Sequence, residues 1–105
     1  MQAPAPVITW FEIPARDYEA TIAFYEAVVG TTLQRRSDPV MGEFAMFPSA
    51  DPAQATGCVA RAVDMMPAPE GTIVYLWVGE TLAPALARAE AHGARIAQAP
   101  IDLPD

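Results

Sequence analysis

The chain has 105 residues, of which 52% are hydrophobic and 18% are charged, and its formal net charge is −7. This length suits a single domain, and the composition excludes intrinsic disorder, which requires few apolar and many charged residues. The acidic balance disfavours a nucleic-acid partner. No apolar run reaches the roughly 20 residues of a membrane span. Because the N-terminal residues also lack a signal-peptide pattern, we expect a cytoplasmic protein without a membrane partner.

The first half of the chain predicts a strand, a helix and three more strands. The β-branched and aromatic run Val7–Ile13 lies between two prolines, which is typical of a strand. Asp17 and Gly30 are a suitable N-cap and C-terminal stop for a helix between them. In that helix apolar side chains recur at helical spacing, at Tyr18, Ile22, Tyr25 and Val29. The later strands are predicted at Thr32–Arg36, Glu43–Phe47 and Gly57–Val63.

The second half begins after a connector rich in proline, residues 64–71. Thr72–Val78 is the strongest strand signal in the chain, because β-branched and aromatic residues fill it. Thr81 is a suitable N-cap for a helix that reaches His92 and ends at Gly93. A short last strand is predicted at Arg95–Gln98.

The two halves match each other when the second is shifted by 63 residues. In this register, which has no gaps, five pairs align: Thr9 with Thr72, Ile13 with Leu76, Asp17 with Glu80, Gly30 with Gly93 and Leu33 with Ile96. Each half therefore runs strand, helix, glycine, strand, but only the first half continues through two more strands. Such a shortened second unit leaves a sheet edge without a partner, and this predicts a homodimer or larger assembly.

Two stretches of the chain resemble the glyoxalase-like proteins of the vicinal oxygen chelate superfamily, which also holds extradiol dioxygenases and bleomycin-resistance proteins. The first comprises Trp10–Pro14, Asp17 and Ala23–Gly30. The second comprises Gly71–Val78, Leu86–Arg88 and Gly93. The resemblance extends from Val7 to Ile101, and its first stretch is the more specific.

The resemblance implies an α+β fold of paired βαβββ modules that form a curved sheet around a cavity, with helices outside. Residues 7–63 are then a complete first module, residues 64–71 a connector, and residues 72–105 a second module without its last two strands. All three parts belong to one glyoxalase-like domain.

Enzymes of this superfamily hold a divalent metal with His, Gln or Glu at four cavity positions. Here the first position corresponds to Trp10 and its counterpart in the second module to Ile73, neither of which coordinates a cation. The fourth strand, Gly57–Val63, supplies neither a carboxylate nor an imidazole. We therefore expect no metal and no other cofactor, although the resemblance by itself favours a metal.

Strand periodicity places Trp10 and Glu12 on one face of the first strand and Phe11 and Ile13 on the other. In the strand predicted at Thr72–Val78 it places Val74, Leu76 and Val78 on one face and Ile73, Tyr75 and Trp77 on the other. The repeat pairs Trp10 and Glu12 with Ile73 and Tyr75 as candidate cavity residues. If Glu12 is buried, desolvation raises its pKa and suits it to general acid or base catalysis. The alternatives are a partly exposed carboxylate, an ion pair with an arginine such as Arg61, or ligand contact without chemistry.

Three aromatic residues, Trp10, Tyr75 and Trp77, are candidates for a wall that stacks a planar or cationic ligand, with core packing as the alternative. Cys58 and His92 have no sequence neighbours that would make them a nucleophile or a metal ligand. We interpret Cys58 as a small apolar filler and His92 as a residue that interacts with the dipole of a helix end.

Together these features predict a protein that binds a small organic molecule without a working metal site. If it is an enzyme, proton transfer by Glu12 fits better than redox chemistry. Two alternatives stay open: a protein of the bleomycin-resistance type that only sequesters a drug, and a metal-dependent lyase or dioxygenase whose ligands a partner chain completes.

Overall fold

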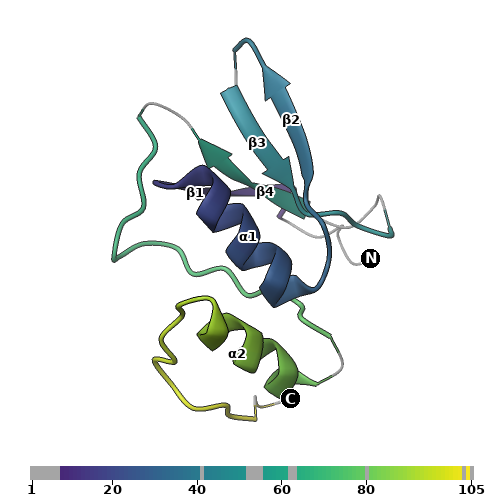
Figure 1. The fold of residues 1–105 in the computed structure, drawn as a ribbon, viewed down its shortest axis with the longest axis vertical. Helices are drawn as coiled ribbons and strands as arrows, with labels where there is room; N and C mark the ends of the chain where they lie inside the picture. The colour runs from purple at the N-terminus through teal and green to yellow at the C-terminus, as the bar shows by residue number, and fades with distance from the viewer. Residues whose placement is uncertain are drawn as a thin grey trace, which may run out of the picture.

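A computed structural model of the protein describes residues 8–40, 42–51, 56–61, 64–79, 81–102 and 104. Four strands form one mixed sheet in the order β1-β4-β3-β2, and two helices accompany it (Figure 1). The predicted α+β fold, with a first module of βαβββ order, is confirmed. In chain order the elements are β1 (Trp10–Pro14), α1 (Tyr18–Val29), β2 (Gln34–Asp38), β3 (Gly42–Met46), β4 (Thr56–Arg61) and α2 (Leu82–Ala91).

Helix α1 begins and ends as predicted. The Asp17 carboxylate accepts a hydrogen bond from the Ala20 N–H at 3.1 Å, which satisfies one of the free N–H groups at the start of the helix. At the other end Gly30 adopts the left-handed conformation with φ 76°, and its N–H donates to the Glu26 carbonyl. The predicted apolar face is also the buried one: Tyr18 and Ile22 are buried, and Tyr25 and Val29 pack beside them.

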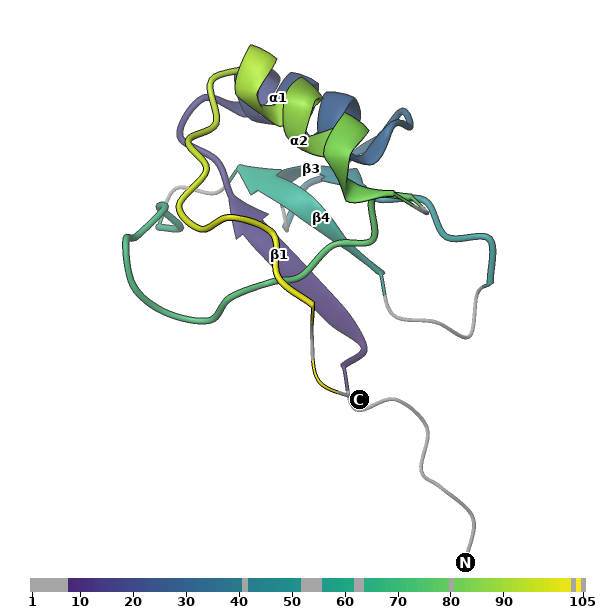
Figure 2. The ribbon, with the colours of Figure 1, turned by 90° about the horizontal axis from the view of Figure 1, so that it is seen from below.

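Pairing of β1 with β4 brings the first and last strands of the module together. The two strands are parallel, with Trp10 opposite Thr56 and Glu12 opposite Cys58. Strand β1 is therefore an edge of the sheet and β4 lies inside it. Both helices lie on one side of this sheet (Figure 2), where α1 covers a core that contains Ala15, Tyr18, Ile22, Leu33, Ala45, Phe47 and Val59.

The alternation predicted for β1 is confirmed. Phe11 and Ile13 pack against the core under α1, whereas Trp10 and Glu12 lie on the opposite face. The predicted strand began too early, because Ile8 and Thr9 are outside β1, and Val7 lies outside the described residues. In the same way residues 62 and 63 of the predicted fourth strand lie outside the described part of the chain.

The predicted strand Thr72–Val78 is wrong, because residues 72–79 form no strand. The segment nevertheless keeps the alternation of a strand: Ile73 and Trp77 are each 74% exposed, while Leu76 between them packs against the core. Strand residues are stable only with a hydrogen-bonded neighbour, and the described chain pairs none with this segment. The short strand predicted at Arg95–Gln98 is wrong as well.

Helix α2 follows Thr81, the predicted N-cap, although the Thr81 side chain makes no capping hydrogen bond. It ends at Ala91 with His92 as the C-cap, and Gly93 follows with φ 96°, as expected of a stop residue. Neither of the described helices is long and apolar enough to cross a membrane.

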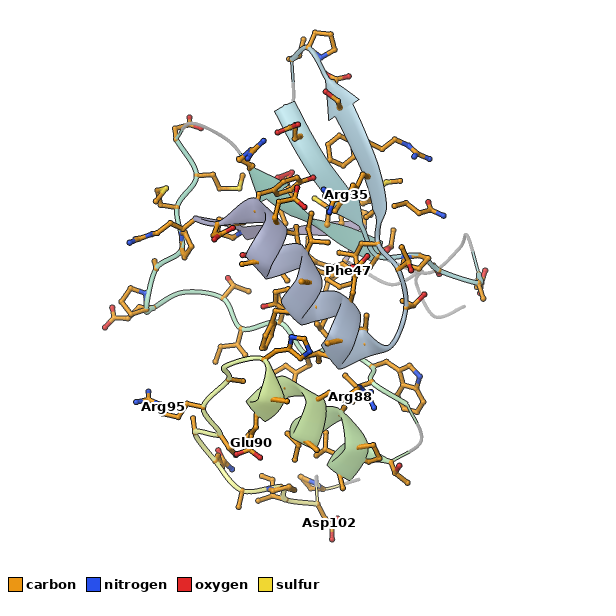
Figure 3. All side chains as sticks on the ribbon, in the orientation of Figure 1. Arg35, Phe47, Arg88, Glu90, Arg95 and Asp102 are labelled. Carbon is orange, nitrogen blue, oxygen red and sulfur yellow. The ribbon has the colours of Figure 1, made fainter. Side chains whose placement is uncertain are left out.

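Arg88 joins the two helices. From α2 its guanidinium donates to the carbonyls of Ala27, at 2.6 Å, and Val28, at 3.2 Å, in the last turn of α1 (Figure 3). These carbonyls have no partner within their own helix, and the last turn of α1 carries no basic residue of its own. Arg88 thus supplies both the missing donors and the positive charge that a helix C-terminus favours.

We expect Arg88→Ala to lower the free energy of unfolding by about 1–2 kcal/mol, since hydrogen bonds from a charged donor are lost from partly buried carbonyls. Amide hydrogen exchange in α2 should become faster, because α2 loses its attachment to α1. The control is Arg95→Ala, since the Arg95 side chain points away from α1 (Figure 3). Equal urea midpoints for the two variants would contradict this role of Arg88.

Candidate functional site

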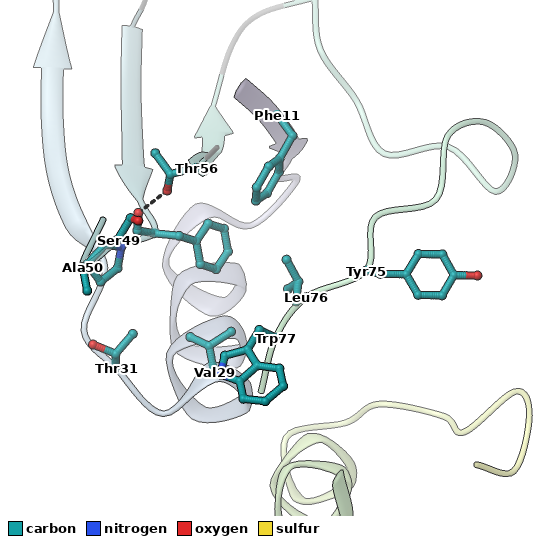
Figure 4. Close-up of a pocket in the computed structure, with 11 residues that line it drawn as sticks. Phe11, Val29, Thr31, Ser49, Ala50, Thr56, Tyr75, Leu76 and Trp77 are labelled. Atoms are coloured by element: carbon teal, nitrogen blue, oxygen red, sulfur yellow. Dashed lines mark hydrogen bonds between the residues drawn. The ribbon is translucent and has the colours of Figure 1, made fainter. Parts of the chain in front are cut away.

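A pocket of about 380 Å³ opens where the 72–78 segment passes the ends of α1, β1 and β3 (Figure 4). We call it the aromatic hollow. Its lining combines large apolar side chains with neutral hydroxyl groups, and none of the described lining residues is charged. The lining residues are Phe11, Val29, Thr31, Phe47, Pro48, Ser49, Ala50, Thr56, Tyr75, Leu76 and Trp77.

Two phenylalanines form the floor of the aromatic hollow. The ring centroids of Phe11 and Phe47 lie 5.6 Å apart, and Phe47 makes an edge contact with Tyr25 at 5.9 Å. Two hydrogen bonds hold the backbone of Phe47 in place. Its N–H donates to the Gly57 carbonyl at 2.9 Å, and its carbonyl accepts from the Thr56 hydroxyl (Figure 4). A preformed apolar floor with a few hydroxyls is typical of a small-molecule site.

The absent side chain of Gly57 makes this floor possible. A Cβ at that position would overlap both the ring and the backbone oxygen of Phe11. Strands β1 and β4 therefore approach closely enough for the Phe11 ring to cover Gly57 and reach Phe47.

Two of the predicted binding residues, Tyr75 and Trp77, line the aromatic hollow, but both are largely exposed, at 85% and 74%. Tyr75 points away from the floor, whereas Leu76 points toward it (Figure 4). The predicted alternation in this segment therefore holds, and it places Leu76 inside. Tyr75 and Trp77, which were expected to form an aromatic wall, lie at the rim of the aromatic hollow.

Glu12 lies in a different place. It lines a second hollow of about 400 Å³, which we call the Glu12 hollow. Trp10 lines neither hollow and is 38% exposed. Neither hollow brings Trp10 and Glu12 together with Ile73 and Tyr75, so the placement of these four residues in one cavity stays a prediction. The lining residues of the Glu12 hollow are Glu12, Ile13, Pro14, Thr21, Tyr25, Pro67, Ala68, Thr72 and Val74.

The Glu12 side chain is exposed at the sheet edge, so the condition of burial on which its catalytic role depended is not met, and the alternative of an exposed carboxylate fits better. Arg61, the alternative partner considered for it, instead pairs with Glu43 and lies 4.9 Å from the centroid of the Tyr18 ring. A catalytic role of Glu12 stays a prediction, but desolvation of its carboxylate does not support it.

Cys58 is buried between Trp10 and Glu12 on the face of the sheet opposite the helices. Desolvation, reinforced by the negative charge of Glu12, raises the pKa of the Cys58 thiol to about 11, and a hydrogen bond from the Trp10 side chain lowers it only in part. The thiol is therefore protonated at neutral pH, which makes it a poor nucleophile and a poor metal ligand. This agrees with the interpretation of Cys58 as a buried filler.

The residues described by the structure do not fit a divalent metal. Among them no three His, Cys, Asp or Glu side chains come together as a ligand group. The positions where the resemblance implies ligands hold an indole at Trp10 and an alkyl group at Ile73, which cannot donate an electron pair to zinc, iron or manganese.

Comparison with known families supports this fold assignment. The family model of the Glyoxalase/Bleomycin resistance protein/Dioxygenase superfamily matches residues 7–105. The chain belongs to this superfamily. No curated protein and no solved structure matches it. Membership in the glyoxalase superfamily fixes the fold class and leaves the chemistry open, since one fold supports many reactions.

Sequence reasoning missed several residues of both hollows. The sequence places Phe11 and Phe47 in predicted strands and Tyr25 on the apolar face of the predicted helix, without a role in binding, and it does not single out Thr21. The strand alternation does point Phe11 toward the helix side. No pattern in the sequence, however, shows that the 72–78 segment leaves an opening over the ring.

Stability at high pH should report the environment of Cys58. Since the folded thiol has a pKa of about 11, above its ordinary value of 9.0, the folded state binds a proton more tightly than the unfolded state. This contribution to stability is complete below pH 9 and is lost as the pH rises toward 11. We expect urea midpoints to fall more steeply over this range for the native chain than for Cys58→Ala. Parallel curves would show that Cys58 is not desolvated.

Proposed function

We propose that this member of the glyoxalase superfamily binds a small, neutral, planar organic molecule in the aromatic hollow and works without a metal. The observation that carries the proposal is the floor formed by Phe11 and Phe47, which lies beneath a rim of neutral hydroxyls. A planar apolar ligand gains by stacking on such rings and by leaving water. A charged ligand would find no counter-ion among the lining residues.

The apolar surface beside the aromatic hollow suits contact with a second copy of the chain. Ile73, Tyr75 and Trp77 project from a segment that pairs with no described strand, and β1 has no paired strand on its outer side in the described part of the chain. Exposed apolar surface of this kind is a usual mark of an interface. We propose a homodimer in which this surface is covered, so that Tyr75 and Trp77 are held over the aromatic hollow.

The other functions are less well supported. Proton transfer by Glu12 requires a substrate at the Glu12 hollow, away from the aromatic floor. Sequestration of a cationic drug conflicts with the uncharged lining of the aromatic hollow. A metal-dependent lyase or dioxygenase requires ligands from beyond the described residues.

Binding can be measured with N-phenyl-1-naphthylamine, a neutral aromatic probe whose fluorescence rises in apolar surroundings. We expect saturable binding, and we expect Trp77→Ala to weaken it about tenfold, because a loss of roughly 1.4 kcal/mol of aromatic contact has that effect. Ile101→Ala is the control, since Ile101 is also an exposed apolar residue, at 65%, but neither lines the hollow nor belongs to the proposed dimer surface. Binding that is absent, or equal in both variants, would reject the aromatic hollow as the site.

Native mass spectrometry of tag-free protein at micromolar concentration tests the metal and the dimer together. We expect the mass of two chains without a bound divalent ion, and no change in melting temperature when zinc, nickel, iron or manganese is added. A stoichiometric metal adduct would favour the lyase or dioxygenase alternative. A monomer would contradict the proposed coverage of Tyr75 and Trp77.

A further inference from the structure

The Glu12 hollow differs from the aromatic hollow in its place and in its chemistry. It lies beside β1, between residues of α1 on one side and the connector and the segment that follows it on the other. Tyr25 belongs to this hollow and Phe47 to the other, and their rings meet edge to face at 5.9 Å. The two hollows therefore lie on opposite sides of one aromatic contact, and none of the described residues lines both.

The charge of the Glu12 hollow is negative. Among the described residues that line it, Glu12 is the single carboxylic acid, and none is Arg, Lys or His. The ion pairs among the described residues join Arg35 to Glu19 and Arg61 to Glu43, so neither arginine neutralises Glu12. The hollow therefore repels anions and attracts cations, in a chain whose net charge is −7.

The other polar groups of the Glu12 hollow suit a ligand that donates hydrogen bonds. The Thr21 hydroxyl gives its proton to the Asp17 carbonyl at 2.7 Å, which leaves its oxygen as an acceptor. Burial raises the pKa of Tyr25, so its hydroxyl stays neutral and adds no charge. Apolar walls come from Ile13, Pro14, Pro67 and Val74.

We propose that the Glu12 hollow binds a small organic ammonium ion. The ammonium group pairs with the Glu12 carboxylate, and the alkyl part packs on the proline and valine walls. A metal cation is a poorer occupant, because one carboxylate does not supply the several oxygen ligands that calcium or magnesium requires. This site is independent of ligand binding in the aromatic hollow.

The test uses butylammonium chloride and butan-1-ol, which have similar alkyl chains and differ in charge, on ¹⁵N-labelled protein at constant ionic strength. We expect butylammonium to shift the amide signals of Thr21, Tyr25, Thr72 and Val74 in a saturable way. Butan-1-ol should shift them much less at the same concentration. Because neither molecule is aromatic, the result does not depend on whether the aromatic hollow binds N-phenyl-1-naphthylamine.

Glu12→Gln should weaken butylammonium binding by about threefold or more, since an exposed ion pair is lost while the shape of the side chain is kept. Glu90→Gln, an equal change of charge on the exposed side of α2, should leave it unaltered. The proposal is overturned if both variants bind equally, if butan-1-ol shifts the same signals as strongly, or if the shifts map elsewhere on the protein.

Discussion

The close contact between Gly57 and Phe11 is the constraint on which both the core and the candidate site depend. Parallel pairing sets these residues opposite each other on β4 and β1, on the side that α1 covers. With no side chain at Gly57, the Phe11 ring lies across β4 and reaches Phe47, the residue that follows β3. One missing Cβ therefore brings three strands into contact under the helix and also leaves an aromatic surface at the end of the core.

The second half of the chain depends on the first. Helix α2 does not cover the sheet by itself but packs on α1, where Arg88 closes the last turn of its neighbour. The same attachment positions the preceding segment, so that Leu76 reaches the core and leaves a hollow on each side. The two hollows thus result from an extended segment that passes β1 without pairing with it.

The error at Thr72–Val78 shows the limit of strand propensity. The residues carry every local mark of a strand, and their alternating exposure follows that pattern. A ladder, however, requires a second strand at hydrogen-bonding distance, and the described chain offers none to this segment. Local preference decided which side chains face inward, while the absence of a paired neighbour decided that no strand forms.

Glu12 shows the same difference between what the local sequence pattern decides and what tertiary packing decides. Its position on the face opposite Phe11 follows from the period of the strand, and that much could be read from the sequence. Its exposure and its separation from Tyr75 and Trp77 depend on where the distant 67–77 segment runs, which no local pattern specifies.

The sequence by itself determined α1 with both of its caps, the βαβββ order of the first module, and the inward and outward faces of β1 and of the 72–78 segment. These features depend on contacts between residues a few positions apart, or on the fixed periods of helix and strand. Only the tertiary structure decided the exposure of Glu12 and the positions of the two hollows. Those properties depend on which distant segments come together, and they are set by packing across the whole core.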